Sequence, residues 1–400
     1  MPLNARMEAV GDYPFDRLRT LLGSLQPPAG LKPIPLSLGE PQHAPPDFLA
    51  EIVAAEKAGW SKYPPMRGTE AARAAIAAWL ARRYRLPDGM VDPETMVVPV
   101  SGTREALFMI ALAAVPETKN GAKPVVLMPN PFYQVYLGAA VMAGAEPVLV
   151  PAGREHGFLP DFAALPGDIL ARTAMAYYCS PANPQGAIAP METMKTLVGL
   201  ARRHDFLLVS DECYSELYYG APPTGAAEAC AALGDTEGSP FRNVAIMNSL
   251  SKRSSAPGLR AGFVAGDPEL IRRFARLRDY GGAPPPLPLL AAATALWGDE
   301  THVVANRAVY AAKYRIAEDI LGGRFGYYTP QGGFYLWLDV GDGEAAARRL
   351  WGEAGIRVIP GAYLARGVDG YNPGAGYIRL ALVHDLETTR EALTRIRDTL

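Results

Sequence analysis

The chain has 400 residues, 49% of them hydrophobic, with 39 basic side chains against 41 acidic ones. This length is enough for a large domain and a smaller one. A formal charge of -2, without blocks of like charge, argues against nucleic acid or an anionic membrane as a partner. We expect a cytoplasmic protein, because its apolar stretches are shorter than the roughly 20 residues that span a bilayer and residues 1–10 resemble no export signal.

Residue types that bind metals or form disulfides are sparse. The three cysteines, Cys179, Cys213 and Cys230, are widely spaced, which is typical of reduced thiols rather than of a disulfide framework. The five histidines are scattered without metal-ligand spacing. We therefore expect no metal site.

Short apolar runs alternate with helical patterns from about residue 95 to residue 265. Such alternation predicts a mostly parallel seven-stranded sheet with helices on both faces. Ligands of such sheets bind beyond the carboxyl ends of the strands. The predicted strands are 96–100, 125–128, 147–150, 174–179, 206–210, 244–248 and 261–265.

A proline-rich stretch at 281–288 ends this pattern. Beyond it, the spacing predicts one long helix over about 289–321, several strands and a last helix over about 386–400, which together indicate a smaller α+β domain. We therefore expect three parts: an N-terminal segment that contributes to the small domain (1–50), a large domain (51–285) and a small C-terminal domain (286–400).

Lys252 lies four residues after the predicted strand 244–248, in the sequence Asn-Ser-Leu-Ser-Lys-Arg. A lysine that forms an imine must be desolvated or lie beside other cations, because its reference pKa is about 10.4. Arg253 and Arg260 are near enough in sequence to provide such charges. Ser-x-x-Lys turns are common, so this segment alone is weak evidence for a catalytic lysine.

The loop after the first predicted strand is suited to binding an anion. Its backbone N–H groups and hydroxyls can face a phosphate at the N-terminus of the next helix. Ser249 and Arg260 could add a hydroxyl and a guanidinium fork. An ordinary helix cap is the alternative interpretation. The loop consists of Ser101, Gly102, Thr103 and Arg104.

Asp211 and Tyr214 follow the predicted strand 206–210 at its carboxyl end. A carboxylate here can keep a pyridine nitrogen protonated, which allows the ring to accept electrons. Two unit charges about 4 Å apart attract by about 4 kcal/mol at an effective dielectric of about 20, which corresponds to two or three pKa units. Tyr214 would lie near the phenolic oxygen of such a ring. A solvated turn is the alternative.

Three further side chains are candidates for ligand contacts. Asn183 lies in a turn made rigid by two prolines, so its amide can face a ligand. Tyr133 offers an aromatic face to a flat ring. Arg379, within an apolar run, needs a carboxylate partner such as that of a substrate. The alternatives are a plain turn, a core aromatic side chain and an arginine on an edge strand.

Together these segments resemble the class I and II aminotransferases, which are pyridoxal phosphate enzymes of fold type I. The resemblance covers nearly the whole chain and implies pyridoxal 5'-phosphate as cofactor, amino acid and keto-acid or aldehyde substrates, and a large domain beside a smaller one. It rests on Gly39-Glu40-Pro41, Tyr63-Pro64, Gly68, Ser101-Gly102-Thr103, Pro131, Tyr133, Asn183-Pro184, Gly186, Asp211, Tyr214, Ser249, Ser251-Lys252, Gly258-Leu259-Arg260, Gly262, Gly332-Gly333-Phe334 and Arg379.

The resemblance implies a role for each residue that contacts the cofactor ring. Lys252 would bind the cofactor's aldehyde and later move a proton from the substrate Cα. Asp211 would pair with the pyridine nitrogen, while Asn183 and Tyr214 would contact the phenolic oxygen. Tyr133 would stack on the ring.

The resemblance also implies the contacts of the cofactor phosphate and of the substrate. Tyr63 of the partner subunit would reach the phosphate, which implies a homodimer with shared active sites. Arg379, with Asn183 and the Gly39 backbone, would bind the substrate α-carboxylate. The other residues expected at the phosphate are Ser101, Gly102, Thr103, Arg104, Ser249, Ser251 and Arg260.

Residues 130–136, 252–260 and 370–374 are similar to proteobacterial succinyldiaminopimelate aminotransferases, a group within this family. That likeness implies amino transfer between glutamate and N-succinyl-2-amino-6-oxopimelate in diaminopimelate and lysine biosynthesis. The proline-rich stretch lacks the second arginine of aspartate aminotransferases, which leaves open how a distal carboxylate is held. The alternatives are another specificity, a carbon–sulfur β-lyase, or a regulator, which would need an attached DNA-binding segment.

Overall fold

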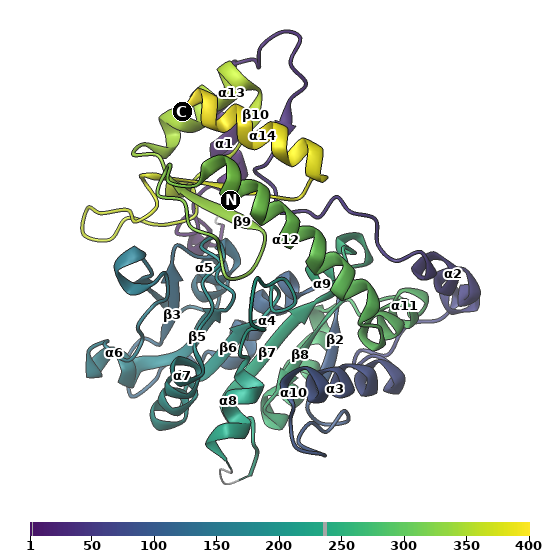
Figure 1. The fold of residues 1–400 in the computed structure, drawn as a ribbon. Coiled ribbons are helices and arrows are strands. Elements are labelled where there is room, and N and C mark those ends of the chain that lie inside the picture. The colour runs from purple at the N-terminus through teal and green to yellow at the C-terminus, as the bar shows by residue number, and fades with distance from the viewer. Residues whose placement is uncertain (2, 235–237) are drawn as a thin grey trace.

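The computed structural model describes residues 1, 3–234 and 238–400. Within these ranges, no helix has both the length and the apolar character needed to cross a membrane. The largest element is a seven-stranded sheet in the order β2-β8-β7-β6-β5-β3-β4 (Figure 1). Its strands are β2 (Val97–Val100), β3 (Val125–Asn130), β4 (Glu146–Pro151), β5 (Thr173–Cys179), β6 (Leu207–Asp211), β7 (Val244–Ser249) and β8 (Gly262–Gly266).

Six strands of this sheet point in one direction and β8 runs antiparallel to both of its neighbours. Every residue of β3, β5, β6 and β7 is buried. Such strands read as continuous apolar runs because both faces of the sheet are covered. The predicted fold class, a mostly parallel seven-stranded sheet between helices, is confirmed.

Two layers of helices cover the sheet, and each layer builds its own hydrophobic core. One layer contains α3 (Glu70–Tyr84), α7 (Met191–His204), α8 (Ala226–Leu233) and α11 (Leu287–Gly298), with α2 (Phe48–Ala55) packed on α11. The other contains α4 (Thr103–Ala114), α5 (Gln134–Met142) and α10 (Pro268–Gly281). The short helices α6 (Gly167–Arg172) and α9 (Leu250–Arg253) lie in connections between strands.

The single helix expected over 289–321 is two helices, α11 and α12 (Thr301–Leu321). Asp299 has an extended backbone, and its carboxylate accepts a hydrogen bond from the backbone N–H of His302, so it starts a new helix. Helix α11 belongs to the core of the large sheet. The domain boundary expected at 285/286 therefore lies too early, because it separates α11 from the large unit with which it packs. From there α12 leads toward the smaller unit (Figure 1).

The smaller unit combines the C-terminal elements with the N-terminal segment. Its antiparallel sheet has the order β11 (Ile359–Pro360), β12 (Tyr377–Ala381), β9 (Tyr335–Asp339). The segment joins it twice: β1 (Ile34–Pro35) pairs with β10 (Ile356–Arg357), and α1 (Pro14–Leu22) packs on α13 (Gly343–Ala354) and β11. The last helix, α14 (Leu386–Thr399), packs on α12 and α13.

Candidate active site

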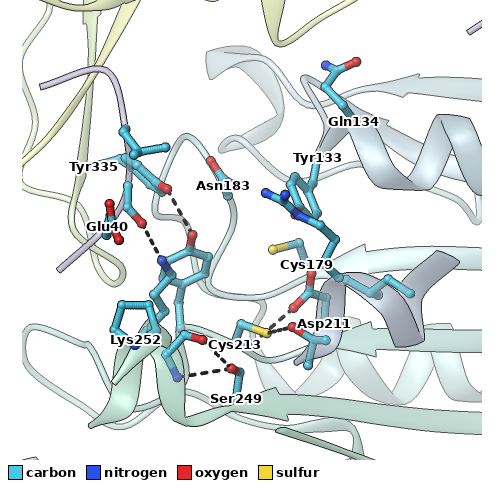
Figure 2. A pocket seen from close by; sticks show the side chains of 18 of the residues that line it. Glu40, Tyr133, Gln134, Cys179, Asn183, Asp211, Cys213, Ser249, Lys252 and Tyr335 are labelled. Carbon is cyan, nitrogen blue, oxygen red and sulfur yellow. Dashed lines mark hydrogen bonds between the residues drawn. The ribbon is translucent and has the colours of Figure 1, made fainter. Parts of the chain in front are cut away.

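A cavity of about 560 Å³ lies at the carboxyl ends of the parallel strands, between the two units. This is where ligands bind in open α/β sheets. Figure 2 shows Lys252 on one side of the cavity, with Asp211 and Tyr133 on the other. The predicted residues that line it are Gly39, Thr103, Arg104, Tyr133, Asn183, Asp211, Tyr214, Ser249, Ser251, Lys252, Arg260 and Arg379.

Three predicted residues are not part of this lining. The Ser101 hydroxyl donates to the carbonyl oxygen of Ala283 at 2.5 Å, so it is directed elsewhere. Gly102 contributes backbone only, with a left-handed φ of 88°. The Tyr63 side chain is fully exposed, and its expected contact would be made with a second subunit.

Lys252 reaches the cavity because α9 begins directly after β7. The hydroxyl of Ser249 caps this short helix by accepting from the backbone N–H of Ser251 at 3.1 Å. Lys252 Nζ donates to the Gly39 carbonyl and lies 5.1 Å from the centroid of the Phe334 ring. Burial lowers the pKa of Lys252 to about 8. A substantial fraction of this amine is therefore neutral and nucleophilic at mildly alkaline pH.

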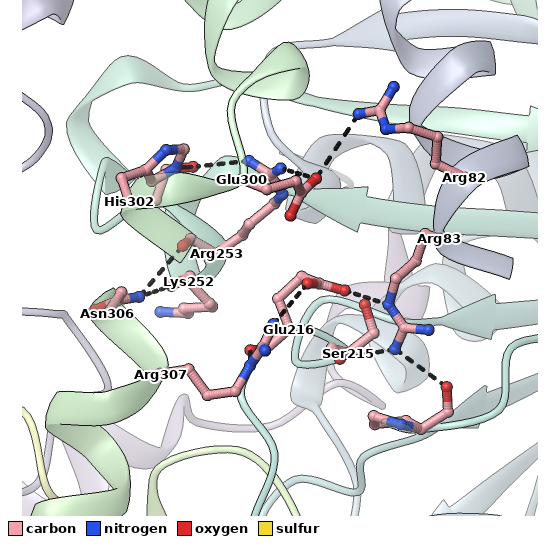
Figure 3. Close-up of polar contacts among 12 residues, drawn as sticks. Arg82, Arg83, Ser215, Glu216, Lys252, Arg253, Glu300, His302, Asn306 and Arg307 are labelled. Atoms are coloured by element: carbon pink, nitrogen blue, oxygen red, sulfur yellow. Dashed lines mark hydrogen bonds and ion pairs between the residues drawn. The ribbon is translucent and has the colours of Figure 1, made fainter. Parts of the chain in front are cut away.

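The backbone of α9 is held from outside the cavity (Figure 3). Asn306, on α12, donates to the carbonyls of Lys252 and Arg253 at 3.1 and 3.2 Å. Arg253 is fully buried, donates to the Leu296 carbonyl at 2.6 Å and pairs with Glu300 at 2.8 Å. Arg253 therefore anchors the helix.

This placement corrects the expectation that Arg253 would act on the lysine, whereas Arg260 lines the same cavity as Lys252. Burial is the largest cause of the lowered pKa of Lys252, and Arg379 and Arg104 are the cations among its other leading causes. Arg253 is turned instead toward the rings of Trp79 and Trp297. Adjacency in sequence was misleading because successive residues of a helix point about 100° apart.

Asp211, at the end of β6, carries a carboxylate that is only 5% exposed. Its Oδ2 accepts from the Tyr136 hydroxyl at 2.5 Å and its Oδ1 from the backbone N–H of Cys213 at 3.3 Å. Burial raises the pKa of Asp211. The groups that oppose this rise are hydrogen-bond donors of Tyr136 and Cys213, which carry no charge. A buried carboxylate needs a cation, and a protonated pyridine nitrogen facing the cavity would fit.

The predicted phosphate loop forms a cradle at the N-terminus of α4. Gly102 has a φ of 88°, a left-handed conformation that favours glycine, and a side chain there would also displace the guanidinium of Arg260. Arg260 Nη2 donates to the Ser101 carbonyl at 3.4 Å, and the hydroxyls of Ser249 and Ser251 share a hydrogen bond of 2.9 Å. A helix N-terminus, a guanidinium and two hydroxyls form a donor set that suits a phosphate.

Arg379 lies on β12, the central strand of the small sheet, so the edge-strand alternative is wrong. Its guanidinium is buried and donates to Asn183 Oδ1 at 3.1 Å and to the Ser37 carbonyl at 2.9 Å. In the described part of the chain its Nε atom has no hydrogen-bond partner. A buried cation with neutral partners fits a substrate carboxylate.

Several cavity residues were not assigned to the site from the sequence. Tyr335 shares a hydrogen bond of 3.1 Å with Tyr214, and its hydroxyl lies against Gly39. Cys213 Sγ lies 3.1 Å from the Thr103 hydroxyl. The only available signal was their position in the sequence: Tyr335 follows Gly332-Gly333-Phe334, and Cys213 lies between Asp211 and Tyr214. The other unpredicted lining residues include Tyr13, Phe15, Glu40, Gln134, Tyr136 and Cys179.

Comparisons with known proteins agree with this geometry. The sequence model of the family described as aminotransferase class I and II matches residues 32–396. The chain is 32% identical over 370 residues to the 4-dedimethylamino-4-oxo-anhydrotetracycline transaminase OxyQ of Streptomyces rimosus, covering 92% of this chain and 94% of that protein. It is 30% identical over 401 residues to an LL-diaminopimelate aminotransferase of Syntrophobacter fumaroxidans, covering 98% and 97%.

Solved structures give the same result. An aminotransferase from Neisseria meningitidis Z2491 superposes with a TM-score of 0.92 at 38% identity, covering 99% of both chains. Aminotransferase AspB from Helicobacter pylori 26695 superposes with a TM-score of 0.87 at 35% identity, covering 97% of this chain and 98% of that one. The family and the cofactor predicted from the sequence are thereby confirmed. The chain belongs to the class I and II aminotransferases, whose cofactor is pyridoxal 5'-phosphate.

Proposed function

We propose that this aminotransferase transfers the amino group of glutamate to N-succinyl-2-amino-6-oxopimelate, as a succinyldiaminopimelate aminotransferase. Support comes from the resemblance at 130–136, 252–260 and 370–374. Relatives named LL-diaminopimelate aminotransferases favour a second candidate, amino transfer that forms LL-diaminopimelate itself. In both candidate reactions, the amino acid that is formed has a second charged end far from the transferred nitrogen.

The observation that carries the proposal is the set of positive charges that line the cavity, Lys252, Arg104, Arg260 and Arg379. In the proposed arrangement, Lys252 binds the cofactor, Arg260 its phosphate and Arg379 the substrate α-carboxylate. Arg104 then remains for a second carboxylate. Its Nε donates to the Tyr133 hydroxyl at 2.7 Å, so the rest of the guanidinium is available to a long acidic substrate.

When bound, pyridoxal phosphate supplies an aldehyde for the lysine and a ring that takes up electrons as the substrate Cα loses its proton. Lys252 Nζ, once freed by the incoming amine, is the proposed base that moves this proton. Asp211 holds the proton on the pyridine nitrogen. Asn183 and Tyr214 donate toward the phenolic oxygen, and Tyr133 covers the ring.

The phosphate is proposed to rest on the Gly102–Thr103 backbone, with Ser249, Ser251 and Arg260 around it. Tyr63 of the partner subunit completes this site in the proposed homodimer. The full exposure of Tyr63 in a single chain is consistent with that role. The cytoplasmic location stays a prediction.

A substrate panel tests the proposed function. We expect glutamate to bleach the visible band of the cofactor-loaded enzyme in a single half-reaction, and the succinylated oxopimelate to restore it faster than pyruvate, oxaloacetate or tetrahydrodipicolinate. Restoration by tetrahydrodipicolinate alone would favour the second candidate. Release of pyruvate and ammonia from a cysteine conjugate, without any keto-acid acceptor, would indicate a β-lyase.

We expect Arg104→Leu to raise KM for glutamate about ten- to a hundredfold, because a charge-assisted hydrogen bond is worth about 1.5–3 kcal/mol. KM for alanine, which lacks the distal carboxylate, should change by less than about threefold. Arg104→Lys, which keeps the charge, should recover part of the loss. If KM for glutamate and KM for alanine rise by the same factor, Arg104 acts on the cofactor phosphate, as first expected from its loop.

A further inference from the structure

Tyr136 connects helix α5 to the end of strand β6. Its side chain is fully buried, and its hydroxyl donates to Asp211 Oδ2 at 2.5 Å. The ring stacks on Tyr177 with centroids 4.4 Å apart and planes 10° apart, and it makes a T-shaped contact with Tyr133 at a centroid distance of 5.7 Å. These packing contacts hold the phenol beside the carboxylate.

We propose that Tyr136 is a positioning residue for the amino-transfer reaction: its hydroxyl holds the Asp211 carboxylate in its charged form and leaves Oδ1 directed at the cofactor's pyridine nitrogen. This inference rests on the proposed contact between Asp211 and that nitrogen. A hydrogen bond that is made only to the ionised carboxylate favours ionisation. The carboxylate then keeps the proton on the pyridine nitrogen instead of taking it back.

This hydrogen bond matters because the other titratable groups around Asp211 carry no positive charge. The titratable groups that face the carboxylate from the elements packed around it are phenols and thiols, and burial raises the pKa of each of them. They are neutral near pH 7 and so give Asp211 no compensating positive charge. Among these residues of the described chain, Tyr136 makes the shortest hydrogen bond to the carboxylate, 2.5 Å from its hydroxyl to Oδ2. The set is Tyr133, Tyr136, Tyr177, Cys179 and Cys213.

The test uses Tyr136→Phe in the full-length protein, without any amino acid substrate. We expect the dissociation constant of pyridoxal phosphate, measured by equilibrium dialysis, to rise about tenfold. We also expect the pH at which the proton leaves Lys252 Nζ, followed through the visible absorption of the bound cofactor, to rise by about half a unit. The reason is that a ring with less positive charge repels this proton less.

Tyr177→Phe is the matched control, because it removes a buried hydroxyl from the same stack. That hydroxyl donates to the Leu107 carbonyl at 2.5 Å and not to Asp211. We expect this variant to keep both the affinity and the pH midpoint of the wild type within twofold and 0.2 unit. Equal behaviour of the two variants would overturn the inference.

A double-mutant cycle separates positioning from packing. In an Asp211→Asn background, we expect Tyr136→Phe to cause no further loss of cofactor affinity, because the charge that the phenol stabilises is gone. A second full tenfold loss there would show that Tyr136 acts through the core alone. A wild-type enzyme that binds the cofactor but ignores glutamate would refute the proposed donor while leaving these substrate-free readings intact.

Discussion

Lys252→Ala is expected to lower the rate of the glutamate half-reaction at least about 10⁴-fold, because it removes both the covalent anchor and the proposed base. The cofactor should still bind through its phosphate and ring contacts. Treatment with a hydride reagent should trap the cofactor on the peptide that contains Lys252 in the wild type. Trapping in the alanine variant, or on another lysine of the wild type, would contradict the assignment.

The depressed pKa of Lys252 adds a pH test of the same residue. Since burial lowers this pKa to about 8, the amine of the cofactor-free enzyme gains nucleophilicity as pH rises through that value. The rate at which added pyridoxal phosphate becomes covalently bound should therefore increase between about pH 7 and 8.5 and then level off. Lys252→Arg is the control: it keeps the positive charge, but its guanidinium stays protonated and should form no link at any of these pH values.

The sheet and most of the candidate site could be predicted because each depends on local sequence. Strands buried on both faces appear as apolar runs, and the ligand side of the sheet follows from its parallel order. The break between α11 and α12 was not predicted, because the helical pattern continues on both sides of Asp299, and the local signal was only the Gly298-Asp299 pair at which α11 ends. The pattern records which face is apolar, not where the backbone hydrogen bonds stop.

Contacts between distant segments could not be predicted from the sequence either. Tyr136 and Asp211 are 75 residues apart, and the helical periodicity alone gives Tyr136 as a core aromatic. Only the packing of α5 on the sheet brings its hydroxyl to the carboxylate. For Arg379, an apolar run is compatible with an edge strand or a central one, and the strand order decides between them.

Asp211→Asn is expected to slow the half-reaction about 10³-fold while the link to Lys252 still forms. Charges about 4 Å apart attract by about 4 kcal/mol at an effective dielectric of about 20, and each 1.36 kcal/mol is a factor of ten. An amide cannot hold the pyridine nitrogen in its protonated form, so the ring accepts electrons poorly. Single-turnover absorbance measures the rate, and Asp211→Glu, which keeps the charge, should lose much less.

The same substitution should stabilise the cofactor-free protein, because burial raises the pKa of Asp211. Between the unfolded and the folded pKa the native state binds more protons than the unfolded chain, so the free energy of unfolding falls as pH rises through this window. The wild type carries that cost at pH 7 and the asparagine variant does not. Thermal unfolding of the two cofactor-free proteins should therefore give a higher midpoint for the variant at pH 7. An equal or lower midpoint would mean that the buried Asp211 carboxylate does not destabilise the cofactor-free protein. The argument that this carboxylate is buried in order to pair with the positive charge of the cofactor ring would then fail.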